Sequence, residues 1–310
     1  MNFPPAQPWA VYAAAALALA AALFCGLARR RAATRARHLG KSLRHLASGH
    51  YNTRIPQATR RPGPGDALGA LASDFNVLAE SLERSRDARQ QWIADISHEL
   101  RTPLTILRGE IQAIEDGVRP LDGAALQSLS AEVRRLGQLV EDLYQLALAD
   151  VGALACRKQP VDLAGIVREA LDLYAARFEG QRLRLEASLP DGQAVAQADA
   201  QRLRQLFCNL LENSLRYTHP GGQVSVGMRL SGGEAVLDFQ DSAPGVPAES
   251  LPRLFDRLYR VERSRSRGSG GAGLGLAICQ TIAEAHGGGL SAQPSPLGGL
   301  WLRLRLPLTS

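Results

Sequence analysis

The chain has 310 residues, of which 45% are hydrophobic, so it is long enough for two or three domains with buried cores. Basic residues outnumber acidic ones 36 to 30, but ten Lys and Arg and no acidic residue fall within residues 1–65. A basic block directly after an apolar run favours a membrane surface over nucleic acid. The four cysteines are far apart and show no Cys-x-x-Cys spacing, so the sequence indicates neither a zinc site nor a disulfide framework.

A membrane span is predicted near the start of the chain. Residues 10–28 carry no charge, and a helix of this length nearly crosses the hydrocarbon core of a bilayer. Three arginines follow, Arg29 to Arg31, and the positive-inside rule then places residues 1–9 outside and the rest of the chain in the cytoplasm. A secretory signal peptide is the alternative, but no positive residue precedes the run.

Residues 29–88 are predicted to form two amphipathic helices joined by a connector. Leu39, Leu43 and Leu46 mark the first helix, and a stretch containing Gly, Pro and Asn follows it. The apolar residues of the second helix are spaced alternately three and four apart, as in a coiled-coil seam. They are Leu68, Leu71, Phe75, Leu78 and Leu82. This arrangement resembles the HAMP signal-relay domain, although Ala67 stands where that family usually has an acid.

Residues 89–152 are predicted to form a helical hairpin with one narrow apolar stripe on each helix. The stripe of the first helix is Ile93, Leu100, Leu107 and Ile114, at intervals of seven. The stripe of the second helix is Leu126, Leu129, Val133, Leu136, Val140, Leu143 and Ala147. One hairpin alone buries too little apolar surface, so a four-helix bundle formed by a homodimer is expected.

Heptad counting places His98 at the position furthest from the partner helices and Pro103 on the inward side. An exposed histidine is usually an ordinary solvated side chain. Here Glu99 stands beside it, so a neutral imidazole can act as a nucleophile while the carboxylate accepts its proton. Pro103 removes a backbone donor and can kink the helix. The segment ISHELRTPL resembles the H-box of two-component sensor histidine kinases, whose histidine is phosphorylated, and the resemblance gives Thr102 a role in dephosphorylating the partner.

Residues 160–308 are predicted to form an α/β domain. Segments of alternating apolar residues are predicted strands, and residues from about 200 to 217 and 274 to 286 are predicted helices. Asn209 and Asn213 lie one helical turn apart, where their amide oxygens either hold a hard divalent cation or are simply solvated. Asp241 ends a predicted strand, where it either accepts a hydrogen bond from an exocyclic amine such as that of adenine or only begins a turn.

A glycine-rich segment precedes the last predicted helix. Its glycines are Gly268, Gly270, Gly271, Gly273 and Gly275. They allow a tight bend around a polyphosphate, the helix N-terminus offers N–H groups to it, and Arg263, Arg265 and Arg267 add positive charge. No strand leads into the glycines and no Gly-Lys-Ser/Thr follows them, so the pattern is neither the Rossmann nor the Walker motif.

Taken in order, these segments resemble the N, G1, F and G2 boxes of the histidine-kinase ATP-binding domain, with LFDRLYRVE as the F box. The resemblance covers about residues 30–308. It implies a Bergerat-type α/β sandwich that binds ATP and Mg²⁺, with Asn209 and Asn213 as metal ligands. The nucleotide-binding residues that it implies are Asn209, Asn213, Arg216, Tyr217, Asp241, Gly245, Tyr259, Gly271, Gly273, Leu274, Gly275 and Leu276. The catalytic residues that it implies are His98, Glu99, Thr102 and Arg257, the last of them at the phosphates.

Within the family, the segments DSAPG, LYRVERSRSR and GGAGLGLAIC are most similar to those of the Bae-type envelope-stress sensor kinases. One departure is Ala243, which stands where the G1 box usually has glycine and narrows the adenine pocket by a methyl group. The resemblance implies that His98 is phosphorylated from ATP and passes the group to an aspartate of a response regulator, with an accompanying phosphatase activity. It also implies a homodimer in the bacterial inner membrane, in contact with lipid, with a single span, a cytoplasmic catalytic part and no direct nucleic acid binding.

Two other functional classes stay open. A GHKL-type ATPase of the gyrase kind shares the fold, but such enzymes activate water with a glutamate at the position of Asn209, and an amide takes no proton at neutral pH. A non-catalytic nucleotide-binding membrane relay is the second class. The complete H-box and N-box count against it.

Overall fold

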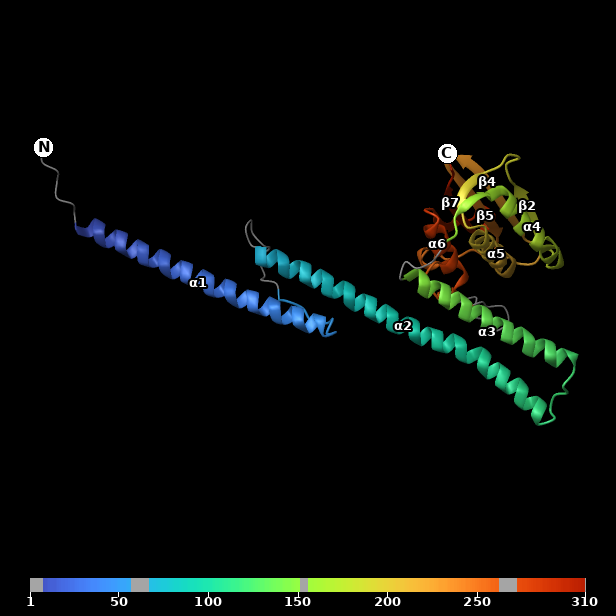
Figure 1. Ribbon diagram of the computed structural model, residues 1–310, viewed down its shortest axis with the longest axis horizontal. Coiled ribbons are helices and arrows are strands. Elements are labelled where there is room, and N and C mark those ends of the chain that lie inside the picture. Colours follow the sequence, from blue (N-terminus) through green and yellow to red (C-terminus); the bar gives the residue numbers. More distant parts are fainter. Residues whose placement is uncertain (1–7, 57–66, 151–155, 262–271, 310) are drawn as a thin grey trace. The chain divides into compact units, whose positions relative to one another are not determined.

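The computed structural model describes residues 8–56, 67–150, 156–261 and 272–309 (Figure 1). Side chains at positions 8–12, 14, 28, 31, 32 and 35 are outside the description. The chain divides into two compact units, one ending at Ala94 and the other beginning at Asp95. This boundary falls inside one long helix, α2 (Ala67–Glu115), so each unit is described separately.

The first unit consists of α1 (Pro8–Ala47), a connector and the beginning of α2. Its core contains Leu46 from α1 and Phe75 and Ala79 from α2, all less than a tenth exposed. The connector is held against α2 because the Asn76 side-chain amide accepts from the Ile55 backbone N–H at 2.8 Å and donates to the Ile55 carbonyl at 2.9 Å. These contacts fix the path of the connector along the second helix of the predicted relay.

Among the described residues, the structure has no helix that is both long enough and apolar enough to cross a bilayer. The span predicted over residues 10–28 is thus not found in the described part of the chain. Ten of those nineteen residues are alanine, which is only weakly hydrophobic, and the side chains at 10–12, 14 and 28 lie outside the described set.

In the second unit, the end of α2 and α3 (Gly123–Asp150) form the predicted hairpin. The Ser128 hydroxyl donates to Glu110 at 2.8 Å and so joins the two helices. The predicted stripe on α3 is mostly exposed within this chain: Leu126, Val133 and Val140 are 57%, 58% and 55% exposed. The face of α3 that was predicted to pack therefore differs from the face that this chain buries against its own residues. The buried positions are Ala125, Leu139, Gln145 and Leu146.

The remaining residues of the second unit form an α/β domain (Figure 1). Its elements are β1 (Gln159–Asp162), α4 (Leu163–Gly180), β2 (Arg184–Ser188), β3 (Val195–Ala198), α5 (Ala200–Tyr217), β4 (Gln223–Ser231), β5 (Glu234–Ser242), a short 3₁₀ helix (Leu251–Arg253), α6 (Gly275–Ala285), β6 (Gly289–Pro294) and β7 (Gly298–Pro307). The main sheet has the order β2-β4-β5-β7-β6. Only β2 and β4 run parallel in it, and β1 and β3 form a separate antiparallel pair.

Alternation along the strands makes this domain a two-layer sandwich. Leu237 and Phe239 of β5 point with Leu302 of β7 into the core beneath α4, α5 and α6, because successive side chains of a strand face opposite ways. The other face is polar, and there Asp238 is held by Arg229 and Arg303. The α/β fold and the helical region expected from the sequence are thus confirmed, with α5 spanning residues 200–217.

Candidate functional site

His98 lies on α2 with its side chain exposed, while Pro103, five residues later, is buried. The helix runs through Pro103, which has no N–H to give to the carbonyl of Glu99. The hydroxyl of Thr102 donates to the carbonyl of His98 at 3.2 Å, so this side chain folds back along the helix. Glu99 is half-buried beside the histidine. The imidazole is therefore accessible from solvent, as heptad counting predicted.

Helix α5 presents Asn209 and Asn213 from one half-buried face. Its opposite face is apolar and packs into the core, and Asp199 caps its first turn by accepting from the backbone N–H of Gln201 at 3.0 Å and of Arg202 at 3.1 Å. This anchoring fixes the two amides on a half-buried face of α5, where the Asn209 side chain also contacts the Cys279 thiol of α6. Their oxygens have the chemistry that Mg²⁺ prefers.

Glu212, next to Asn213, is already occupied. Arg177 donates to its carboxylate at 2.7 Å and the Tyr174 hydroxyl at 3.2 Å, while Arg216 lies 3.6 Å away in an ion pair. Arg216 is exposed and Tyr217 is half-buried at the end of the same helix.

Asp241 is 5% exposed at the end of β5. The Leu300 backbone N–H donates to its Oδ1 at 2.6 Å, and the Ser214 hydroxyl of α5 is a second partner. Burial raises the pKa of the Asp241 carboxyl to about 6, against the effect of both hydrogen bonds. β7 can approach this closely because residue 299 is glycine, since a Cβ there would lie 2.2 Å from Asp241 Oδ1. Each carboxylate oxygen has two lone pairs, so Asp241 could accept a further hydrogen bond from a donor on a ligand.

The turn after Asp241 reaches the surface. Gly245 is exposed, and a Cβ on it would stand 3.1 Å from the Gly298 carbonyl. Ala243 is exposed as well, and its carbonyl accepts from the His219 N–H at 3.1 Å.

The start of α6 is joined to the predicted F box. Gly273 has φ +73°, and a Cβ on it would lie 2.9 Å from the Tyr259 carbonyl oxygen, so only glycine fits without strain. The Leu258 N–H donates to the Gly273 carbonyl at 3.0 Å. Leu274 is 1% exposed. The next residue, Gly275, lies next to α5, because a Cβ on it would be in van der Waals contact with Asn209 Cγ at 4.0 Å. Asn209 therefore stands beside the N-terminus of α6.

Some predicted residues lie elsewhere or outside the description. Tyr259 is half-buried, and the Arg253 guanidinium lies 4.2 Å from the centroid of its ring. Leu276 is half-buried in the first turn of α6. Arg257 forms a two-bond ion pair with Asp150 at the end of α3, one bond of which is 2.6 Å. The expectation for Gly271 and for the arginines between residues 262 and 271 falls outside the described residues.

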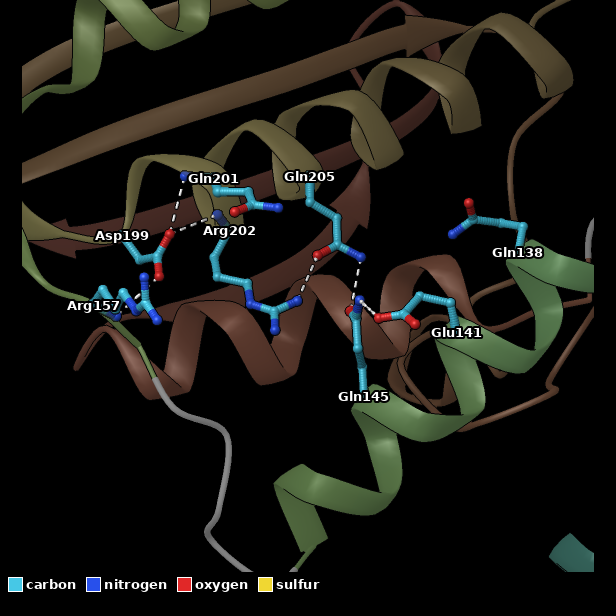
Figure 2. Close-up of a pocket in the computed structure, with 8 residues that line it drawn as sticks. All are labelled: Gln138, Glu141, Gln145, Arg157, Asp199, Gln201, Arg202 and Gln205. Carbon is cyan, nitrogen blue, oxygen red and sulfur yellow. Dashed lines mark hydrogen bonds between the residues drawn. The ribbon is translucent and has the colours of Figure 1, made fainter.

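Sequence reasoning missed a hydrogen-bond chain between α3 and α5 (Figure 2). Arg202 donates to the Gln205 oxygen at 3.2 Å, Gln205 donates to Gln145 at 2.8 Å, and Gln145 donates to Glu141 at 2.9 Å. The chain borders a cavity of about 610 Å³ whose lining also includes Asp199. Together with Leu139 and Leu146, which belong to the core of the α/β domain, it fixes that domain against α3. The signal for this contact in the sequence was Gln145, a polar residue among the apolar residues of α3.

Family models match two parts of the chain. Residues 88–152 match the His Kinase A (phospho-acceptor) domain, and residues 198–310 match the histidine kinase-, DNA gyrase B-, and HSP90-like ATPase. Among curated relatives, the signal transduction histidine-protein kinase BaeS of Escherichia coli is 47% identical over 99% of this chain and 65% of its own length. The chain therefore spans about two thirds of that relative.

Two solved structures are also similar. The Acinetobacter baumannii histidine kinase AdeS is 28% identical, with a TM-score of 0.59 over 69% of this chain and 98% of its own. The histidine kinase ThkA in complex with the response regulator protein TrrA has a TM-score of 0.57 at 18% identity, over 74% of this chain and 66% of its own, and supports the fold alone.

Proposed function

Because the chain belongs to the two-component sensor histidine kinases and resembles their Bae-type members, we propose that it phosphorylates His98 from ATP and passes the phosphoryl group to an aspartate of a response regulator. The observation that carries this proposal is the pairing of an exposed histidine with a separate nucleotide-type domain. The domain packs against α3, the partner helix of the hairpin that bears the histidine.

In this proposal Asp241 accepts a further hydrogen bond from the adenine amine, as its burial beside Gly299 supports. The phosphates lie at the N-terminus of α6, where the backbone N–H groups of residues 274–276 face them. Asn209 and Asn213 would hold Mg²⁺, which supplies charge neutralisation when bound. These residues position the γ-phosphate for in-line attack and do no covalent chemistry themselves.

The transfer itself takes place at His98. A ring nitrogen of the neutral imidazole attacks the γ-phosphorus, the bond from that phosphorus to the ADP oxygen breaks, and the other ring nitrogen loses its proton to Glu99. Glu99 directly follows His98, and the side chains of successive helix residues point about 100° apart. Its side chain therefore reaches the ring by turning along the helix. Thr102, folded back on the His98 carbonyl, is proposed to assist water in the reverse, dephosphorylating reaction.

Incubation with ATP labelled at the γ-phosphate tests the proposal. We expect an acid-labile, base-stable label on the wild type, none on His98→Ala and an undiminished one on His219→Ala, which removes another exposed histidine. Phosphate release without any protein label would indicate a GHKL-type ATPase instead. If neither a protein label nor phosphate release is observed, the result favours a non-catalytic relay.

We also infer a homodimer, because Leu126, Val133 and Val140 form an apolar stripe on α3 that stays exposed to solvent in the single chain. Val133→Asp should lower the molar mass measured by light scattering to that of one chain, whereas Arg134→Asp, one residue on, should leave it unchanged. Full retention of the dimer by Val133→Asp would count against this stripe as the interface.

The remaining parts of the proposal rest on the resemblance. The receiver-domain partner is supported by the match of residues 88–152 to the His Kinase A (phospho-acceptor) domain. A location at the bacterial inner membrane, with the catalytic part in the cytoplasm, is supported by the basic, acid-free first 65 residues. Fractionation of cells that express the chain would test the location.

A further inference from the structure

Two histidines come together where α1 ends and the connector begins. The ring centroids of His45 and His50 are 5.7 Å apart, and their planes are tilted by 46°. Both side chains are exposed. They are held by the turn between them, since the His50 N–H and the Ser48 hydroxyl donate to the His45 carbonyl at 3.0 Å and 2.8 Å.

Ser48 also decides which nitrogen of His50 carries the proton. Its oxygen lies 3.0 Å from His50 Nδ1. A hydroxyl has one proton, and when that of Ser48 is directed to the His45 carbonyl, the second contact needs the ring as its donor. In that tautomer a neutral His50 ring carries its proton on Nδ1 and presents a lone pair on Nε2 to a metal. Metal-binding histidines in proteins are fixed in this way by a partner on the other ring nitrogen.

The spacing of the rings suits one shared ion. Two imidazoles on a tetrahedral zinc ion, with metal–nitrogen bonds of about 2.0–2.1 Å, have centroids roughly 5 Å apart. The observed 5.7 Å is reached from that value by small rotations of two exposed side chains.

The surroundings also select the kind of cation. No acidic residue occurs in residues 1–65, and Arg44 precedes His45, so neither histidine has a carboxylate close to it along the chain that could hold a hard cation. Neutral imidazole nitrogens suit zinc, nickel and copper. The described residues contain no cluster of three or more His, Cys, Asp or Glu that could hold a metal, so water would complete the coordination.

We propose that His45 and His50 form a site for a divalent first-row transition metal, with Ser48 as the residue that orients His50. A bound ion would join the last turn of α1 to the start of the connector that Asn76 holds on α2. This inference is independent of the kinase activity, because the site lies in the first unit and its test measures metal binding alone.

The test uses the full chain, freed of metal by a chelator and titrated with Zn²⁺ in the absence of nucleotide. Equilibrium dialysis with metal analysis should show one Zn²⁺ per chain that is lost, or bound at least tenfold more weakly, in His45→Ala and in His50→Ala. His38→Ala is the matched control, because His38 is an exposed histidine seven residues before His45 on the same helix. It should bind as the wild type does. Ser48→Ala should weaken binding by about tenfold, as loss of a hydrogen-bond partner of a metal ligand does.

A second measurement follows the rings directly. In a chain with ¹⁵N-labelled histidine, Zn²⁺ should shift the ring resonances of His45 and His50 together at the same concentration, while those of His38 stay in place. Equal binding by the wild type and both variants would overturn the proposal. So would an equal loss in His38→Ala, which would indicate nonspecific binding to surface histidines.

Discussion

Replacing Asp241 by asparagine should make the nucleotide domain more stable while abolishing ATP binding. The carboxyl is buried, and its pKa is raised to about 6 in the folded protein. In the unfolded chain its pKa is about 3.9, and each pH unit of difference corresponds to about 1.4 kcal/mol. Above pH 6 the ionised carboxylate therefore costs the folded state about 3 kcal/mol.

The sign follows from proton binding. Between about pH 4 and pH 6 the folded state binds the proton more tightly than the unfolded state, so the free energy of unfolding of the wild type falls as the pH rises. Asparagine keeps an oxygen for the Leu300 N–H and offers its amide to the Ser214 hydroxyl, which can accept as well as donate. Asp241→Asn should thus be about 2–3 kcal/mol more stable at pH 8 and nearly equal to the wild type at pH 4.

Urea unfolding followed by the fluorescence of Trp301 measures this difference. The chain has three tryptophans, so Trp9→Phe and Trp92→Phe in both proteins leave Trp301, on β7, as the single reporter. The matched control is Asp238→Asn on the same strand. Hydrogen bonds from Arg303, Trp301 and Arg229 lower the pKa of Asp238 despite its burial, so this change should destabilise the domain above pH 4.

Equal stability of Asp241→Asn and wild type at pH 8, or a difference of the same size at pH 4 and pH 8, would refute the reasoning. Retention of ATP binding by the more stable variant would refute the role given to the carboxylate in adenine recognition. Loss of stability at both pH values would instead indicate that the side chain acts mainly through its hydrogen bonds.

Three further predictions concern other parts of the molecule. Burial lowers the pKa of His286, whose neutral ring accepts the Asp199 N–H at 2.9 Å. The free energy of unfolding should therefore fall as the pH drops below about 6.5, and it should fall less in His286→Gln. Urea midpoints at pH 7.5 and 5.5 would measure the difference. Gly273→Ala should cost at least about 2 kcal/mol, because its φ of +73° is strained for alanine and the added methyl meets backbone atoms at 2.9 Å; an unchanged thermal midpoint would contradict this. Asn76→Ala should cost about 1–3 kcal/mol and speed hydrogen exchange at the Ile55 amide, with exchange at α5 amides as the internal control.

Local periodicity predicted much of the architecture. The interval of seven on α2 was enough to place His98 outward and Pro103 inward, because a helix that packs along one stripe must expose the opposite face. Alternation along β5 and β7 predicted strands with one apolar face, and the structure confirms it. These predictions succeeded because each depends only on neighbours a few residues away.

Contacts between distant segments were not predictable in the same way. Heptad counting assigned one stripe to α3, whereas the helix has a second one, at Leu139 and Leu146, that packs into the α/β domain. Two stripes one residue apart merge into one broad apolar face in the sequence. The ion pair of Arg257 with Asp150 joins residues 107 positions apart, and no local pattern indicates it.

Ionic strength should act unequally on the two polar contacts that hold the nucleotide domain on α3. The side chains of Asp150 and Arg257 are 46% and 30% exposed, so dissolved ions reach their charges and screen them. The other contact passes through the uncharged amides of Gln145 and Gln205, of which Gln145 is buried, and salt hardly weakens a neutral hydrogen bond. Concentrated electrolyte would therefore weaken the contact at Arg257 and leave the contact at Gln145 in place, so a salt titration separates the contribution of the ion pair from that of the amides.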